Sequence, residues 1–243
     1  MSDFTGRRIV ITGGAGGIGI ATARAFLEHG AHVLLIDIEE SRLGAAREAL
    51  AGGSRVTTFA SNLSRPDLCA RVLDRVEGTL HALVHLAGVF ERDPLEPSEH
   101  GVWDRAIAAN LTNAYDMCVA FTRRTQGAKP ARIVLTSSIA YRRGGPAHAA
   151  YSAAKGGIVG LTRALSRQLA PDVLVNAIAP GIIVTRMTDE IIAARGEQLL
   201  SQIPLKRFGK PEEVAGVVRF LCSDDASYIN GQTITIDGGI TNA

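Results

Sequence analysis

The segment Tyr151-Ser-Ala-Ala-Lys155 places a phenol and an ammonium group on one face of a helix, a single turn apart. A tyrosine side chain has a reference pKa of about 10, so acid/base work near pH 7 needs a drop of roughly 3 units. A nearby ammonium group stabilises the phenolate and lowers that pKa. Ser138 stands thirteen residues earlier and can donate a hydrogen bond to a carbonyl or alkoxide oxygen. These three residues indicate proton transfer at a carbonyl or an alcohol.

A glycine-rich turn, Thr12 to Gly19, follows the first apolar run and precedes a helical pattern. Gly13, Gly17 and Gly19 permit a tight turn and let the backbone approach a pyrophosphate, while the helix N-terminus supplies free N–H groups. The spacing differs from the Rossmann pattern G-x-G-x-x-G. Strand, glycine turn and helix in this order nevertheless predict a dinucleotide-binding turn.

Asp37 lies at the end of the second predicted strand, 24 residues after Gly13. At that place a carboxylate can accept hydrogen bonds from both hydroxyls of an adenosine ribose. It would repel a 2′-phosphate, and no Arg or Lys occurs among residues 13–19 or next to Asp37. The sequence therefore favours NAD over NADP as cofactor.

The chain that must position these groups alternates short apolar runs with amphipathic helical stretches from end to end. The predicted strands are residues 8–11, 32–36, 55–59, 82–86, 132–136, 174–178 and 233–236, and the clearest helices are 21–29, 42–50, 68–76 and 157–169. This order predicts an α/β fold of Rossmann type, doubly wound, with a seven-stranded parallel sheet and helices on both faces. Since no linker or repeat interrupts it, we expect residues 1–243 to form a single domain.

Composition excludes several classes of function. Hydrophobic residues make up 46% and charged residues 21% of the chain, which is typical of a globular protein. The net charge of +2 is spread along the sequence, so we expect no nucleic-acid partner. No apolar run approaches the roughly 20 residues that span a bilayer, and no export signal is visible, so we expect a cytoplasmic protein without membrane contact. Three scattered cysteines (Cys69, Cys118, Cys222) and the histidines His81 and His85 are interpreted as core residues, with no metal site.

Taken together, these features resemble the short-chain dehydrogenase/reductase family in its single-domain form, over essentially the whole chain. The residues that carry the resemblance are the Thr12 to Gly19 turn, Asn110, the Ser138/Tyr151/Lys155 set, Asn176-Ala-Ile-Ala-Pro-Gly181, Thr185, and the segments 207–215, 228–231 and 237–239. So many ordered matches make chance agreement negligible.

The resemblance implies a role for each matching residue. Tyr151 would be the general acid/base, Ser138 would hold the substrate oxygen, and Lys155 would bind the nicotinamide ribose. Asn110 would hold a water molecule in a proton relay, and Thr185 would bond the nicotinamide carboxamide. The cofactor-binding residues would be Gly13, Gly17, Ile18, Gly19, Asp37, Asn62, Leu63, Ala87, Gly88, Tyr151, Lys155, Pro180, Gly181, Ile183 and Thr185.

Three segments depart from the usual family pattern. His85-Leu86-Ala-Gly stands where Asn-Asn-Ala-Gly is usual, so the bonds that brace the neighbouring strand must be made differently, with His85 as the candidate. Asn62-Leu63 replaces an Asp-Val or Asp-Leu pair that contacts adenine, and we expect a modest effect. The connection at residues 170–176 is one residue short, with no expected loss of function.

The residues and the resemblance predict an NAD(H)-dependent oxidoreductase that moves hydride between the nicotinamide and a secondary alcohol or ketone. A polyol, sugar or hydroxy acid is favoured as the small-molecule substrate. The alternative is a 3-oxoacyl-(acyl-carrier-protein) reductase, although Asp37 argues against the NADPH usual for that enzyme. A remote alternative is an NAD-binding sensor without turnover. The resemblance also implies a homotetramer.

The substrate side is expected around Val89, Ile139, His148 and Met187. Residues 186–203 form the predicted lid, since its apolar residues (Met187, Ile191, Ile192, Leu199 and Leu200) recur at spacings near three and four. The nearby cations Arg142, Arg143, His148 and Arg186 favour an anionic or hydroxyl-rich substrate.

Overall fold

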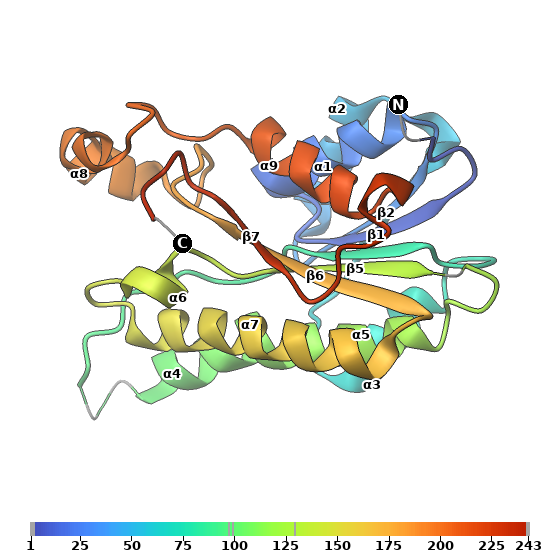
Figure 1. The fold of residues 1–243 in the computed structure, drawn as a ribbon, viewed down its shortest axis with the longest axis horizontal. Helices are drawn as coiled ribbons and strands as arrows, with labels where there is room; N and C mark the ends of the chain where they lie inside the picture. The colour runs from blue at the N-terminus through green and yellow to red at the C-terminus, as the bar shows by residue number, and fades with distance from the viewer. Residues whose placement is uncertain (1–2, 97, 99, 129, 242–243) are drawn as a thin grey trace.

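A computed structural model describes residues 3–96, 98, 100–128 and 130–241 of the chain (Figure 1). Its centre is a seven-stranded parallel sheet in the order β3-β2-β1-β4-β5-β6-β7. The strands are β1 (Arg8–Thr12), β2 (His32–Asp37), β3 (Val56–Ala60), β4 (Ala82–His85), β5 (Ala131–Thr136), β6 (Val173–Pro180) and β7 (Thr233–Ile236). The predicted doubly wound α/β fold is thereby confirmed.

Helices cover both faces of the sheet. On one face, above the sheet in Figure 1, lie α1 (Gly17–Leu27), α2 (Glu40–Leu50) and α9 (Pro211–Leu221). On the other lie α3 (Pro66–Leu73), α4 (His100–Ile107), α5 (Asn113–Thr122) and α7 (Ala149–Leu169), with the π-helical segment η3 (Ala108–Thr112) joining α4 to α5. The short helix α6 (Ala140–Arg143) and α8 (Asp189–Gln202) lie together at one end of the molecule. No helix in the described part of the chain is long and apolar enough to cross a membrane.

The strands are apolar on both sides because each face of the sheet has its own core. Ile9 and Ile11 of β1 pack with α1 and α9, whereas Val10 between them packs with α3 and α5. Side chains that alternate along a strand point to opposite faces, so the sequence of β1 supplies both cores. This double burial explains why the strands could be predicted from continuous apolar runs.

The differences from the predicted elements concern their ends. Helix α7 begins at Ala149, eight residues before the predicted start, so Tyr151 and Lys155 share the helix that continues to Leu169. Asn110 lies in η3, the π-helical segment that interrupts the regular helical path from α4 to α5. Chain order reverses between β1 and β4, and in such sheets a ligand crevice opens at that place, outside the carboxyl ends of the strands.

Candidate functional site

Tyr151, Ser138 and Lys155 meet where the end of β5 faces the first turns of α7. The Tyr151 hydroxyl is hydrogen-bonded to Ser138. Lys155 Nζ lies 5.5 Å from the centroid of the Tyr151 ring and donates to the carbonyl oxygen of Thr136 at 3.0 Å. The Ser137 hydroxyl donates to the Lys155 backbone oxygen at 2.7 Å, which ties β5 to α7. The structure therefore brings together the three residues whose types suggested proton transfer.

Burial opposes ionisation of both groups. It raises the pKa of Tyr151, and the hydrogen bond with Ser138 acts in the opposite sense. Burial also lowers the pKa of Lys155 to about 8. The sequence argument expected Lys155 to lower the tyrosine pKa, whereas in the chain without ligand desolvation is the larger influence. At neutral pH Tyr151 thus carries its proton and can donate it to a substrate oxygen.

Asn110 holds the loop that follows β4. Its amide nitrogen donates to the carbonyl oxygens of Val89 and Ala106, both at 3.0 Å, and its Oδ1 accepts from the Val89 N–H at 3.2 Å. A Cβ added to Gly88 would lie 2.4 Å from Asn110 Oδ1 and 3.3 Å from Lys155 Nζ. Gly88, Asn110 and Lys155 are therefore packed so closely that only glycine fits at position 88.

His85 joins neighbouring elements at the place where asparagine is usual in the family. Its Nε2 lies 3.2 Å from Asn113 Oδ1 and its Nδ1 lies 3.0 Å from Thr12 Oγ1, which itself accepts from the Ala87 N–H at 3.2 Å. Because the Asn113 oxygen only accepts, Nε2 carries the proton and Nδ1 accepts from the Thr12 hydroxyl. Burial, together with the charge of Lys155, lowers the pKa of His85 to about 3. The neutral imidazole thus connects β1, β4 and α5 beneath the turn at Ala87.

The glycine turn fits a pyrophosphate group. Gly13 has a φ of +65°, and a Cβ on Gly19 would lie 2.3 Å from the Gly13 carbonyl oxygen. Within the described residues, the N–H groups of Gly17, Ile18 and Gly19 have no protein acceptor. An anion at the start of α1 would satisfy them and would meet the positive end of the helix dipole.

Asp37 lies beside the same turn. Its Oδ2 accepts from the Ala15 N–H at 3.1 Å and its Oδ1 accepts from the Ile38 N–H at 2.8 Å. The guanidinium of Arg42 donates to the Ala15 carbonyl at 3.1 Å. Sequence reasoning missed Arg42, which is five positions after Asp37 and is carried back to the turn by the first turn of α2. A cation therefore does stand near the proposed ribose site, contrary to the sequence-based expectation.

The remaining predicted cofactor residues line the carboxyl ends of the strands. Pro180 ends β6, and its carbonyl accepts from the Ile139 N–H at 3.1 Å. Gly181 packs on Asp237, since an added Cβ would lie 2.8 Å from Asp237 Cβ. Ile183 forms a bridge with Gly209. The Thr185 methyl group would lie 3.0 Å from a Cβ on Gly17, so Thr185 stands against the start of α1.

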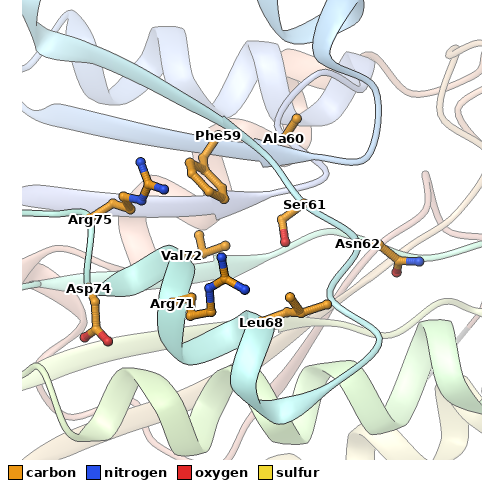
Figure 2. Close-up of a pocket in the computed structure, with 9 residues that line it drawn as sticks. All are labelled: Phe59, Ala60, Ser61, Asn62, Leu68, Arg71, Val72, Asp74 and Arg75. Atoms are coloured by element: carbon orange, nitrogen blue, oxygen red, sulfur yellow. The ribbon is translucent and has the colours of Figure 1, made fainter.

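Asn62 borders a hollow of about 490 Å³ between β3 and α3, shown in Figure 2. Phe59 and Ser61 line it from the strand side, and Leu68 and Arg71 line it from the helix side. The hollow is next to the position that the resemblance gives to adenine. The Leu63 side chain is only 6% exposed and packs in the core, so only its backbone could face a ligand.

On the substrate side, Phe90 organises the wall. Its ring stacks on His148 with centroids 4.1 Å apart and meets Tyr151 edge-on at 4.9 Å. Val89 is held by Asn110, and Ile139 by Pro180, as described above. Met187 is 55% exposed, in the segment that leads into α8. The position of Phe90 after the fourth predicted strand places it in the substrate pocket, but its stacking on His148 and its contact with Tyr151 could not be predicted from the sequence.

Comparison with known proteins decides the family. Residues 13–241 match a family described as Enoyl-(Acyl carrier protein) reductase. A curated relative, the 3-oxoacyl-(acyl-carrier-protein) reductase FabG of Thermotoga maritima, is 37% identical over 97% of this chain and 98% of its own length. The chain belongs to the short-chain dehydrogenase/reductase family. Another relative with the same name, from Chlamydia muridarum, is 36% identical over 98% of this chain and 99% of its own length.

Some of the similar solved structures are titled as dehydrogenases of sugars, polyols or sugar acids. A short-chain dehydrogenase/reductase from Brucella melitensis, titled glucose/ribitol dehydrogenase, has a TM-score of 0.94 and 37% identity, and each chain is covered completely. A putative NAD(P)-dependent gluconate 5-dehydrogenase from Beutenbergia cavernae, with NADP bound at low occupancy, has a TM-score of 0.91 and 34% identity over 98% of each chain. The comparisons therefore support an oxidoreductase that binds a nicotinamide cofactor.

Proposed function

We propose that this enzyme reduces the 3-keto group of a 3-oxoacyl thioester to a hydroxyl group, with NADH as the preferred cofactor. The observation that carries the reductive chemistry is the half-buried Tyr151, whose hydroxyl is hydrogen-bonded to Ser138 and which has Lys155 beside it. The two curated relatives described above are named 3-oxoacyl-(acyl-carrier-protein) reductases and match this chain over nearly their whole length. Their names support a thioester substrate. They favour what the sequence offered as the alternative substrate over a polyol, sugar or hydroxy acid.

The residues of this chain would act on the substrate oxygen. When bound, the reduced nicotinamide supplies the hydride. Ser138 donates a hydrogen bond that orients the ketone and stabilises the negative charge that develops on its oxygen. Tyr151 gives that oxygen a proton, and the adjacent Lys155 stabilises the resulting phenolate. Phe90 and His148 stack beside Tyr151 on the side where the substrate would lie.

Asp37 supports the choice of NADH over NADPH. Its carboxylate remains at the end of β2, beside the turn that would hold the adenosine end, and it would repel a 2′-phosphate. Arg42 lies close enough to reduce this repulsion, because Asp37 bonds the Ala15 N–H and Arg42 bonds the carbonyl oxygen of the same residue. We therefore propose a preference for NADH rather than complete rejection of NADPH.

A second candidate activity is oxidation of a polyol, sugar or hydroxy acid, or reduction of the matching ketone. The names of the similar solved structures favour it. Two cations also favour this activity. Arg142 and Arg143 belong to α6, which follows Ser138 closely, and could attract an anionic or hydroxyl-rich substrate. A sensor without turnover is opposed by the presence of Asn110, Ser138, Tyr151 and Lys155 in one site.

A comparison of two ketones tests the substrate. Reduction of acetoacetyl-coenzyme A and of a keto sugar acid would be followed with NADH and with NADPH at one pH. We expect kcat/KM for the thioester to exceed that for the sugar acid by at least about tenfold, which corresponds to about 1.4 kcal/mol of transition-state binding. A faster reaction of the keto sugar acid would replace the first proposal with the second.

We also propose a homotetramer in the cytoplasm. The outward faces of α4 and α5 expose Trp103, Tyr115 and Val119, which are apolar side chains that a second copy could cover. All three cysteines are buried free thiols, as is usual in a reducing compartment.

A further inference from the structure

Helix α7, which carries Tyr151 and Lys155, begins without a cap from its own sequence. His148 occupies the N-cap position and makes no side-chain hydrogen bond to the helix. Its Nδ1 lies 2.8 Å from the Pro146 carbonyl oxygen instead. The first N–H groups of a helix lack intrahelical acceptors, so they need a partner from elsewhere.

Asp93 supplies that partner from the loop after β4. Its Oδ2 accepts from the Ala150 N–H at 3.1 Å, next to Tyr151, and its backbone N–H donates to the Ala147 carbonyl at 2.7 Å. Its Oδ1 accepts from the Leu95 N–H at 3.0 Å, which fixes the carboxylate within its own loop. Ala147 has a φ of 57°, a left-handed conformation that an alanine adopts only when its surroundings impose it.

The same loop carries Phe90, three residues before Asp93. Phe90 stacks on His148 and meets the Tyr151 ring edge-on. The Asp93 bonds and the Phe90 contacts thus join the loop to the beginning of α7 at two neighbouring places. We infer that Asp93 is a positioning residue: it caps α7 from the loop after β4 and thereby holds Tyr151, His148 and Phe90 in register with the substrate.

The cofactor side of the loop is held by other residues. Ala87 is bonded to Thr12, and Val89 is bonded to Asn110. Loss of the Asp93 carboxylate should therefore disturb the substrate wall and the position of Tyr151 and leave the dinucleotide turn intact. This inference rests on the proposed function only in the role of Tyr151 as proton donor, and it does not depend on which ketone is reduced.

The test compares Asp93→Ala and Asp93→Asn with the control Glu91→Ala. Glu91 is on the same loop, but its carboxylate pairs with the exposed Arg105 at 3.0 Å instead of α7. The experiment measures kcat and KM for whichever of the two ketones is reduced faster, and the dissociation constant of NADH by fluorescence. We expect kcat of Asp93→Ala to fall about tenfold, since displacement of a reacting group by a fraction of an ångström is costly.

In the same experiment, NADH affinity should stay within about twofold. Asp93→Asn should recover part of kcat, because its single amide oxygen can still accept from Ala150 although the bond from Leu95 is then lost. Glu91→Ala should resemble the wild type. The inference is overturned if Asp93→Ala keeps wild-type kcat, if it loses NADH affinity as strongly as kcat, or if Asp93→Asn is as slow as Asp93→Ala. If the thioester proves inactive while the keto sugar acid is reduced, the proposed substrate fails and this test still applies.

Discussion

Burial favours the uncharged form of both Tyr151 and Lys155. It keeps the proton on Tyr151, whereas it favours loss of the proton from Lys155, whose pKa is lowered to about 8. Near pH 7 the pair therefore consists of a neutral phenol and an ammonium group. This is the protonation state that carbonyl reduction requires, since the substrate oxygen must receive a proton.

His85 should make the folded state sensitive to acid. Its pKa is about 3 in the folded chain and about 6.5 in the unfolded chain, so below about pH 6.5 only the unfolded chain binds this proton. The free energy of unfolding should then fall by up to about 1.4 kcal/mol per pH unit. In His85→Asn this contribution is absent, so the difference in stability should shift in favour of the variant as pH falls.

Urea denaturation at several pH values between about 7 and about 4 measures this difference. His100→Asn is the control, because His100 has a side chain that is 75% exposed. Parallel stability curves for wild type and His85→Asn would show that His85 does not titrate as described.

Asp37 and Arg42 should act in opposite directions on cofactor choice. We expect kcat/KM with NADH to exceed that with NADPH by at least about tenfold in the wild type, since repulsion and a lost charge-assisted bond exceed about 1.4 kcal/mol. Asp37→Ala should narrow this ratio, and Arg42→Ala should widen it. The ratio is measured from initial rates with both cofactors. A kcat/KM of the wild type with NADPH that equals or exceeds that with NADH would contradict the proposed preference for NADH.

The strands could be predicted because both faces of the sheet are buried. The loops and the first residues of the helices could not be predicted. The run before His85 reads as a strand because helices cover both sides of it. Tyr151 and Lys155 could be placed on a helix, but its first residue, Ala149, and its continuity with residues 157–169 could not be predicted, since the cap comes from Asp93, more than 50 residues away. The π-helical turn at Asn110 and the return of Arg42 to the glycine turn are likewise set by tertiary contacts, which no local periodicity records.

We propose that helix α8 is a movable lid. None of its residues, all of which the structure describes, is buried, and its backbone is non-helical at Arg195. Its end is joined to α6 by a hydrogen bond from Arg143 to Gln202 at 2.8 Å. Hydrogen exchange of residues 186–203 should slow when NADH and a substrate analogue are both added, because closure buries the half-exposed apolar side chains. If hydrogen exchange of these residues does not change, α8 does not close over the site.

At the scale of the whole molecule, the exposed faces of α4 and α5 should assemble the chain. Light scattering at micromolar concentration should give a mass near four times 25.7 kDa. Tyr115→Asp places a charge on the face where Tyr115 is 50% exposed and should lower that mass without unfolding the subunit. A wild-type mass near that of a single chain would contradict the tetramer.

The fold as a whole brings the glycine turn before α1, His85 of β4 and Tyr151 of α7 to one end of a parallel sheet. From sequence alone, residue types and spacing located Tyr151, Lys155 and the glycine turn. The direction in which the pKa of Tyr151 is shifted could not be predicted, because it depends on how α7 and the loop that carries Phe90 enclose the phenol.

We propose that Tyr151 gives the proton in ketone reduction, and a single-turnover measurement on Tyr151→Phe tests this role. The variant keeps the ring against Phe90 and removes the hydroxyl bonded to Ser138. With acetoacetyl-coenzyme A and NADH, we expect the rate of NADH oxidation to fall by about 10² to 10⁴-fold while NADH affinity changes little. A variant that retains more than about a tenth of the wild-type rate would contradict the claim.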